Sequence, residues 1–154
     1  MLAVDGPSGS GKTTFAEAIA ERVPDARVLH VDDLLDGWEG LPGVPRSLDA
    51  LLRPLAGGAP GRYLHYDWVQ GRFTHEVSVE PTPLLVLDGV GSGCVEIADL
   101  VTVLVWLEVD DDVRRDRALA RDGEALLPHW DAWQRAERTH HAVHRTRERA
   151  DLTF

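Results

Sequence analysis

The sequence predicts a doubly wound α/β sandwich, in which helices cover both faces of a parallel sheet of five strands. The main reason is that short apolar runs alternate along the chain with segments of helical spacing. These runs carry no alternating polar residues, a pattern typical of strands that are covered on both faces. The length of 154 residues suits a single domain with such a sheet.

The first half of the chain begins with an apolar strand at residues 2–5, which stops at a glycine-rich turn. Apolar residues at helical spacing follow over residues 12–23, and a proline ends this helix. The second strand lies at residues 27–31, and the glycine- and proline-rich stretch at residues 36–46 is expected to be an irregular loop. Ser47 is then expected to cap a short helix that carries regularly spaced leucines.

The second half starts with two β-like runs, residues 62–68 and 72–79, which predict a hairpin. Unbroken apolar strands follow at residues 84–87 and 101–107. The chain continues with two helices and a last strand, at residues 110–121, 130–149 and 150–154. We therefore expect one domain over residues 1–154, in which residues 36–83 form an insertion beyond the carboxyl edge of the sheet.

Composition and charge exclude several classes of protein. Sixteen basic and 26 acidic residues give a net charge of −10, which disfavours binding to nucleic acid or to an anionic membrane. The first residues do not resemble a signal peptide and no apolar run is long enough to span a bilayer, so we expect a cytoplasmic protein. Cys94 is the only cysteine, which excludes an internal disulfide. His140 and His144, one helical turn apart, are expected on a solvated helix face.

Residues 6–13, Gly-Pro-Ser-Gly-Ser-Gly-Lys-Thr, match the phosphate-loop pattern G-x-x-x-x-G-K-[ST] at every fixed position. They also lie between an expected strand and an expected helix, as the pattern requires. The glycines let backbone N–H groups converge on phosphate oxygens, Lys12 adds charge there, and Thr13 can bind Mg²⁺. The sequence thus predicts binding of ATP and Mg²⁺. The nucleotide-binding residues are expected to be Gly6, Ser8, Gly9, Ser10, Gly11, Lys12, Thr13 and Thr14.

Two further carboxylates follow strands of the expected sheet, at the edge where ligands bind in open parallel sheets. Asp88 comes directly after the strand at residues 84–87 and is the candidate for binding Mg²⁺, directly or through water. Asp32 follows the second strand, where a carboxylate that faces the phosphate loop can accept the proton of an attacking hydroxyl. Asp33 is the alternative for this general base, and the pair could instead cap the next segment.

The helix at residues 110–121 carries Arg114, Arg117 and Arg121 at a spacing that places them on one face. Phosphoryl transfer requires cations around the transferred group, so an arginine-lined lid over residues 110–123 suits that chemistry. The alternative is a solvated face, because five aspartates lie in the same segment.

The order and spacing of these motifs resemble the uridine kinase/phosphoribulokinase-like branch of the P-loop kinases. The motifs are residues 6–13, 31–33, 66–68, 87–90 and 121–123. The resemblance implies a three-layer P-loop fold with a small substrate-side insertion that contains the hairpin. It also implies ATP-dependent transfer of a phosphoryl group to a small hydroxyl compound, either nucleoside-like or sugar-like. The resemblance assigns Asp32 the role of the base, Asp67 a contact to the acceptor, and Arg117 and Arg121, together with Lys12 of the loop, a role on the phosphates. Tyr66 and Trp68 flank Asp67 in the expected insertion and are further candidates for binding the acceptor, with packing of the tryptophan as the alternative.

Two departures from this family leave the acceptor open. Asp88 stands where uridine kinases usually carry glutamate, and residues 74–76, Thr-His-Glu, stand where they carry a His-Ser-Arg step. Two other functions therefore stay open. A nucleotide-dependent switch or ATPase needs a segment that orders around the γ-phosphate, such as residues 36–46. A nucleoside-monophosphate kinase needs a second phosphate site, for which the candidates are Arg46, Arg53, Arg62 and Arg72.

The resemblance also bears on the nucleotide base, which in this family lies between the lid and the loop after the final strand. The contacts that a phosphate loop and Mg²⁺ make are with the phosphates and do not involve the nucleotide base. Because the sequence ends within the expected last strand, we expect little discrimination between ATP and GTP.

Overall fold

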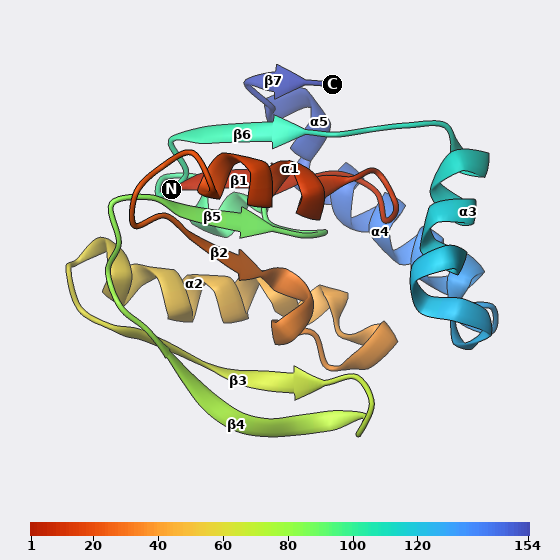
Figure 1. Ribbon diagram of the computed structural model, residues 1–154, viewed down its shortest axis with the longest axis horizontal. Coiled ribbons are helices and arrows are strands. Elements are labelled where there is room, and N and C mark those ends of the chain that lie inside the picture. The colour runs from red at the N-terminus through yellow and green to blue at the C-terminus, as the bar shows by residue number, and fades with distance from the viewer.

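A computed structural model describes residues 1–154, with a parallel sheet of five strands in the order β2-β5-β1-β6-β7 at its centre (Figure 1). The strands are β1 Leu2–Asp5, β2 Arg27–His30, β5 Leu85–Asp88, β6 Val103–Trp106 and β7 Leu152–Thr153. Val4 of β1 lies beside Asp88 of β5 and Val105 of β6, so the carboxyl ends of these three strands reach one edge. The predicted α/β fold and its five-stranded parallel sheet are confirmed.

Helices cover both faces of this sheet, which explains why the three central strands β5, β1 and β6 are almost entirely apolar. The helices are α1 Lys12–Ala20, α2 Val44–Ala56, α3 Asp111–Asp122, α4 Trp130–His144 and α5 Thr146–Arg149. On one face Val4 and Val105 pack with Ala16 of α1, and on the other the leucines of α2 and Trp133 of α4 complete the larger core. Helix α3 lies beyond the carboxyl ends of the strands (Figure 1).

The predicted hairpin is present as a separate two-stranded sheet of β3 (Gly61–Asp67) and β4 (Arg72–Val79). It lies on the far side of α2 from the main sheet (Figure 1). A side chain at Gly61 would clash with Leu51 of α2, so this glycine lets β3 approach the helix closely. The hairpin also contacts the short 3₁₀ turn at Val31–Leu34 that follows β2, which brings it toward the carboxyl edge of the main sheet.

Three local expectations are wrong. Helix α2 begins at Val44, before Ser47, because Pro45 suits a first helical turn, and the Ser47 hydroxyl donates to the Gly43 carbonyl instead of capping the helix. The loop before α2 is not irregular throughout, since it contains short 3₁₀ turns at Gly37–Glu39 and Leu41–Gly43. The last long helix breaks at Arg145, which adopts a left-handed conformation between α4 and α5.

The expectation of a solvated histidine face is also wrong, because the side of α4 that carries His140 and His144 packs against the protein. Only 7% of His140 and 6% of His144 is exposed. No group of three or more His, Cys, Asp or Glu residues is placed to hold a metal ion. Cys94 is fully buried, as expected for a small core residue. None of the helices combines the length and the apolarity needed to cross a membrane.

Candidate active site

The phosphate loop connects β1 to α1 and lies at the carboxyl edge of the sheet, as its sequence pattern requires. Two of its glycines are needed for close approach of other backbone segments. Gly6 (φ +144°) and Gly9 (φ +81°) have backbone angles that L-residues rarely adopt. A Cβ at Gly6 would clash with the Leu107 carbonyl, and a Cβ at Gly9 would come within 2.9 Å of the Arg114 Cα. Helix α3 therefore rests directly on the loop.

Lys12 begins α1, and its ammonium group lies among carboxylates. Its side chain is buried, and Nζ donates to the carbonyl of Pro7 at 2.9 Å. Burial lowers the pKa of Lys12, whereas the nearby charges of Asp5 and Asp32 oppose this shift. The loop thus holds a cation, together with the α1 N-terminus, at the place where phosphate charge is expected.

Asp88 ends β5 with a carboxylate whose two oxygens differ in environment. Only 3% of the residue is exposed; Oδ2 lies 2.9 Å from Nδ1 of His30, and Oδ1 is buried without a hydrogen-bond partner. The hydrogen bond to Asp88 raises the pKa of His30. A buried carboxylate oxygen with an unused lone pair fits Mg²⁺ or its bound water, because Mg²⁺ takes few protein ligands besides substrate phosphates. Thr13, in the first turn of α1, supplies an accessible hydroxyl.

Asp32 and Asp33 lie in the 3₁₀ turn after β2 and face different neighbours. Asp33 accepts a hydrogen bond from the Tyr63 hydroxyl at 3.4 Å and lies 3.7 Å from Nδ1 of His65, both on the hairpin. Desolvation raises the pKa of Asp32, and the charges of Lys12 and Arg121 oppose that rise. Asp32 remains exposed to solvent. Asp32 is therefore the carboxylate that faces the cations of the phosphate site.

The three arginines of α3 all lie near the loop or the carboxylates, but in different ways. The guanidinium group of Arg117 lies beside Gly11 of the loop, since its Nη1 would be 3.9 Å from a Cβ at that glycine. Arg121 pairs with Asp122 at 2.7 Å, and its charge acts on Asp32 and Asp88. Arg114 is different, because only 4% of it is exposed and its guanidinium group points into the protein beneath the loop.

The three hairpin residues expected to bind the acceptor differ in their contacts. The Trp68 indole donates to the Asp32 carbonyl at 3.2 Å and packs edge-on against Trp38. Tyr66 is buried and packs against Trp68. The Asp67 carboxylate accepts hydrogen bonds from the backbone N–H groups of Val69 and Gln70 and from the Gln70 side chain. Trp68 is thus brought to the candidate base, whereas Asp67 closes the hairpin turn.

Sequence reasoning missed two sets of residues that support the loop. Asp5, fully buried at the end of β1, accepts backbone hydrogen bonds from Gly6 and Gly93 and lies 3.1 Å from Nε2 of His141. Burial opposes it, but the hydrogen bond and charge of His141, followed by the two backbone hydrogen bonds, hold the pKa of Asp5 below its ordinary value. Glu137 of α4, fully buried, accepts the N–H of Ser8. Its position one turn after Trp133 was the available signal that it lies on the inward face of the helix.

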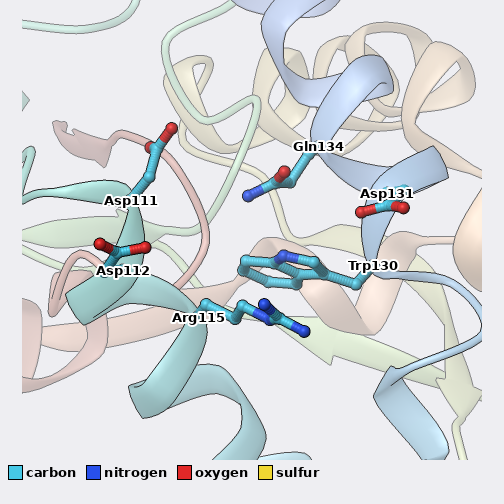
Figure 2. A pocket seen from close by; sticks show the side chains of 6 residues that line it. All are labelled: Asp111, Asp112, Arg115, Trp130, Asp131 and Gln134. Carbon is cyan, nitrogen blue, oxygen red and sulfur yellow. The ribbon is translucent and has the colours of Figure 1, made fainter.

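A cavity of about 340 Å³ between α3 and α4 is distinct from the phosphate site. Figure 2 shows the Trp130 ring between Gln134 and Arg115, with Asp111 and Asp112 across from it. The cavity contains no residue of the phosphate loop, and its three aspartates outnumber its single arginine. This acidic lining disfavours binding of a triphosphate.

Comparisons with known proteins agree with this geometry, although no protein-family model matches the chain. The chain is 30% identical over 141 residues to a uridine kinase of Lactobacillus helveticus, covering 79% of this chain and 67% of the relative. It is also 30% identical over 142 residues to a uridine kinase of Latilactobacillus sakei, covering 81% and 67%. A solved structure of a possible uridine kinase from Bacillus stearothermophilus shares the fold, with a TM-score of 0.68 at 19% identity over 99% of this chain and 86% of that chain. The chain therefore belongs to the uridine kinase-like family.

Proposed function

We propose that this protein is an ATP-dependent kinase that phosphorylates a hydroxyl group of a nucleoside-like small molecule. The observation that carries the proposal is that Lys12, Asp32 and Asp88 follow or end the neighbouring strands β1, β2 and β5 at one edge of the sheet. Arg121 of α3 adds a charge that acts on Asp32 there. Such a group combines a base for the acceptor hydroxyl with cations for the phosphates and a carboxylate for the metal. The nucleoside character of the acceptor rests on the uridine kinases that this chain is similar to.

In the proposed reaction, the acceptor hydroxyl gives its proton to the Asp32 carboxylate while its oxygen attacks the γ-phosphorus of ATP. The bond between the γ-phosphorus and the oxygen that bridges to the β-phosphate breaks, and ADP leaves with the bonding electron pair. Lys12 and Arg121 stabilise the charge that spreads over the transferred group. The raised pKa of Asp32 makes it a stronger base than an ordinary aspartate.

Mg²⁺ fits the same site and would neutralise phosphate charge when bound. The Thr13 hydroxyl and Asp88 would hold it, and the partnerless Oδ1 of Asp88 is the observation that favours this assignment. His30 occupies the other oxygen and so orients the carboxylate.

The structure gives little support to a nucleoside-monophosphate kinase. Three of the four arginines considered for a second phosphate site are engaged elsewhere. Arg53 pairs with two aspartates, Arg62 pairs with Glu76, and Arg72 donates to Gln70. Each of these guanidinium groups would have to leave its present partner before it could bind a phosphate.

The test is ADP formation from ATP and Mg²⁺ with a panel of acceptors, namely nucleosides, pentoses and nucleoside monophosphates. We expect turnover that depends on a nucleoside or sugar hydroxyl, with the phosphorylated acceptor identified by mass spectrometry. Equal ADP formation with and without every acceptor would reject the kinase and favour the ATPase or switch. Transfer only to monophosphates would identify a nucleoside-monophosphate kinase instead.

A further inference from the structure

Ser8, in the first half of the phosphate loop, is held by two helices that lie more than 100 residues away in the sequence. Its N–H donates to Oε2 of Glu137 at 2.9 Å, and its carbonyl accepts from Nη1 of Arg114 at 3.0 Å. Its hydroxyl accepts from Nε1 of Trp133 at 2.6 Å. The backbone N–H and carbonyl of Ser8 are thus both engaged within the protein, and its hydroxyl oxygen accepts a third hydrogen bond.

Glu137 and Arg114 form an ion pair that is almost completely removed from solvent. Nη1 of Arg114 lies 3.0 Å from Oε1 of Glu137, and the two side chains are 4% and 1% exposed. A buried ion pair seldom stabilises a fold more than apolar side chains of the same size would. In this structure the pair instead supplies two hydrogen-bonding groups to one loop residue. Glu137 accepts the N–H of Ser8, and Arg114 donates to the Ser8 carbonyl.

The next residue of the loop is fixed by backbone contact. The space where a Cβ of Gly9 would lie is taken by the carbonyl, C and Cα of Arg114. Arg114 therefore meets the loop through both its side chain and its backbone. Helix α3, which also carries Arg117 and Arg121, therefore contacts the loop at both Ser8 and Gly9.

We propose that Glu137 is a positioning residue of the phosphate loop, which with Arg114 fixes Ser8 and so aligns the loop for the triphosphate before ATP arrives. Both oxygens of Glu137 are engaged by protein groups, so it acts through Ser8 and not on the nucleotide. The proposal rests on the proposed function only in taking ATP as the ligand of the loop. Preorganisation of this kind strengthens binding because ordering is completed before the ligand binds.

Two double variants isolate the hydrogen bond that the Ser8 N–H donates to Glu137. Arg114→Met/Glu137→Gln removes the ion pair but keeps a side-chain oxygen that can accept the Ser8 N–H. Arg114→Met/Glu137→Met removes the ion pair and the acceptor, with a side chain of similar size. We measure ATP affinity by calorimetric titration, the KM values for ATP and for the acceptor, and the Tm. Replacement of a buried ion pair by apolar side chains is expected to preserve folding.

Both variants lack the contact between Arg114 and the Ser8 carbonyl, so the comparison is between the two of them. We expect the methionine variant to bind ATP about tenfold more weakly than the glutamine variant, a loss of the size that one lost hydrogen bond gives. The KM for ATP should follow this ranking, while the KM for the acceptor should change less than about twofold. Leu52→Val, at a fully buried position of α2, lowers stability without removing a loop contact and should leave ATP affinity unchanged.

Equal ATP affinity in the two double variants would overturn the positioning role. It would also be overturned if the KM for the acceptor rose in the methionine variant as much as the KM for ATP. A loss of ATP affinity in Leu52→Val as large as that in the methionine variant would also overturn it, since stability alone would then explain the effect. These outcomes differ from failure of the kinase proposal, in which the wild type binds ATP but transfers no phosphoryl group. A wild type that binds no ATP would reject both.

Discussion

Gly9→Ala tests the contact between α3 and the phosphate loop, because it adds one methyl group at the point where they meet. The added Cβ would lie within 2.9 Å of the Cα and carbonyl carbon of Arg114 and still closer to its carbonyl oxygen. All three atoms belong to the backbone of a helix, so no side chain can turn aside. Gly58→Ala is the matched control, since its φ of +80° is within one degree of that of Gly9 (+81°) and no neighbouring atom lies within 4 Å of its added Cβ.

The expected loss of stability has two contributions, the backbone conformation of the alanine and the overpacking of its methyl group. A left-handed alanine costs about 1–2 kcal/mol, and the lower freedom of the unfolded chain returns about 0.4–1 kcal/mol, so we expect Gly58→Ala to lose about 1 kcal/mol. Gly9→Ala carries the same cost and adds an overpacking cost of about 1–3 kcal/mol. At about 2–4 °C per kcal/mol for a domain of this size, the Tm of Gly9→Ala should lie about 2–12 °C below that of Gly58→Ala.

The assay is thermal unfolding of both variants and the wild type under identical conditions, followed by circular dichroism. ATP titrations of the same samples should show weaker binding for Gly9→Ala only, because the displaced loop no longer aligns its N–H groups. Equal Tm values for the two variants would refute the reasoning, since α3 would then not rest on Gly9 in solution.

The remaining predictions concern the site and its pH dependence. Lys12→Ala should abolish ATP turnover with a nearly unchanged Tm; retained turnover would contradict its role on the phosphates. Asp32→Asn should lower kcat by about 10²-fold or more with little change in the KM for ATP, and a larger loss in Asp33→Asn would move the base to that residue. Arg121→Ala should lower kcat more than it raises either KM, because its charge acts on the transition state; an effect confined to KM would argue for simple binding. Burial lowers the pKa of His140 from 6.5 to about 4, so between these values the unfolded chain binds a proton that the folded chain does not. Stability in urea should therefore fall as the pH drops from 6.5 toward 4, and a wild-type slope that matches that of His140→Leu would remove His140 as a cause.

The local sequence was sufficient to predict the features that depend on neighbouring residues. The loop at residues 6–13 needs only its glycines, one lysine and a flanking strand and helix, all of which are contiguous. The apolar strands predicted a sheet covered on both faces, and parallel strands bring their carboxyl ends to one edge. The placement of Asp32 and Asp88 near Lys12 followed from that rule without any knowledge of side-chain contacts.

Tertiary structure decided which polar residues are buried and what they hold. Glu137, His140 and His144 lie in a helix with many charged residues, and the sequence alone favoured a solvated face for the histidines. All three are buried because α4 packs against the loop and the sheet. The buried side chains of Trp130 and Trp133 place one side of this helix against the core. The three partners of Ser8 lie 106, 125 and 129 residues along the chain, separations at which no periodicity or spacing links the residues. The chemistry of the loop is therefore encoded locally, whereas its support depends on contacts that exist only after the chain has folded.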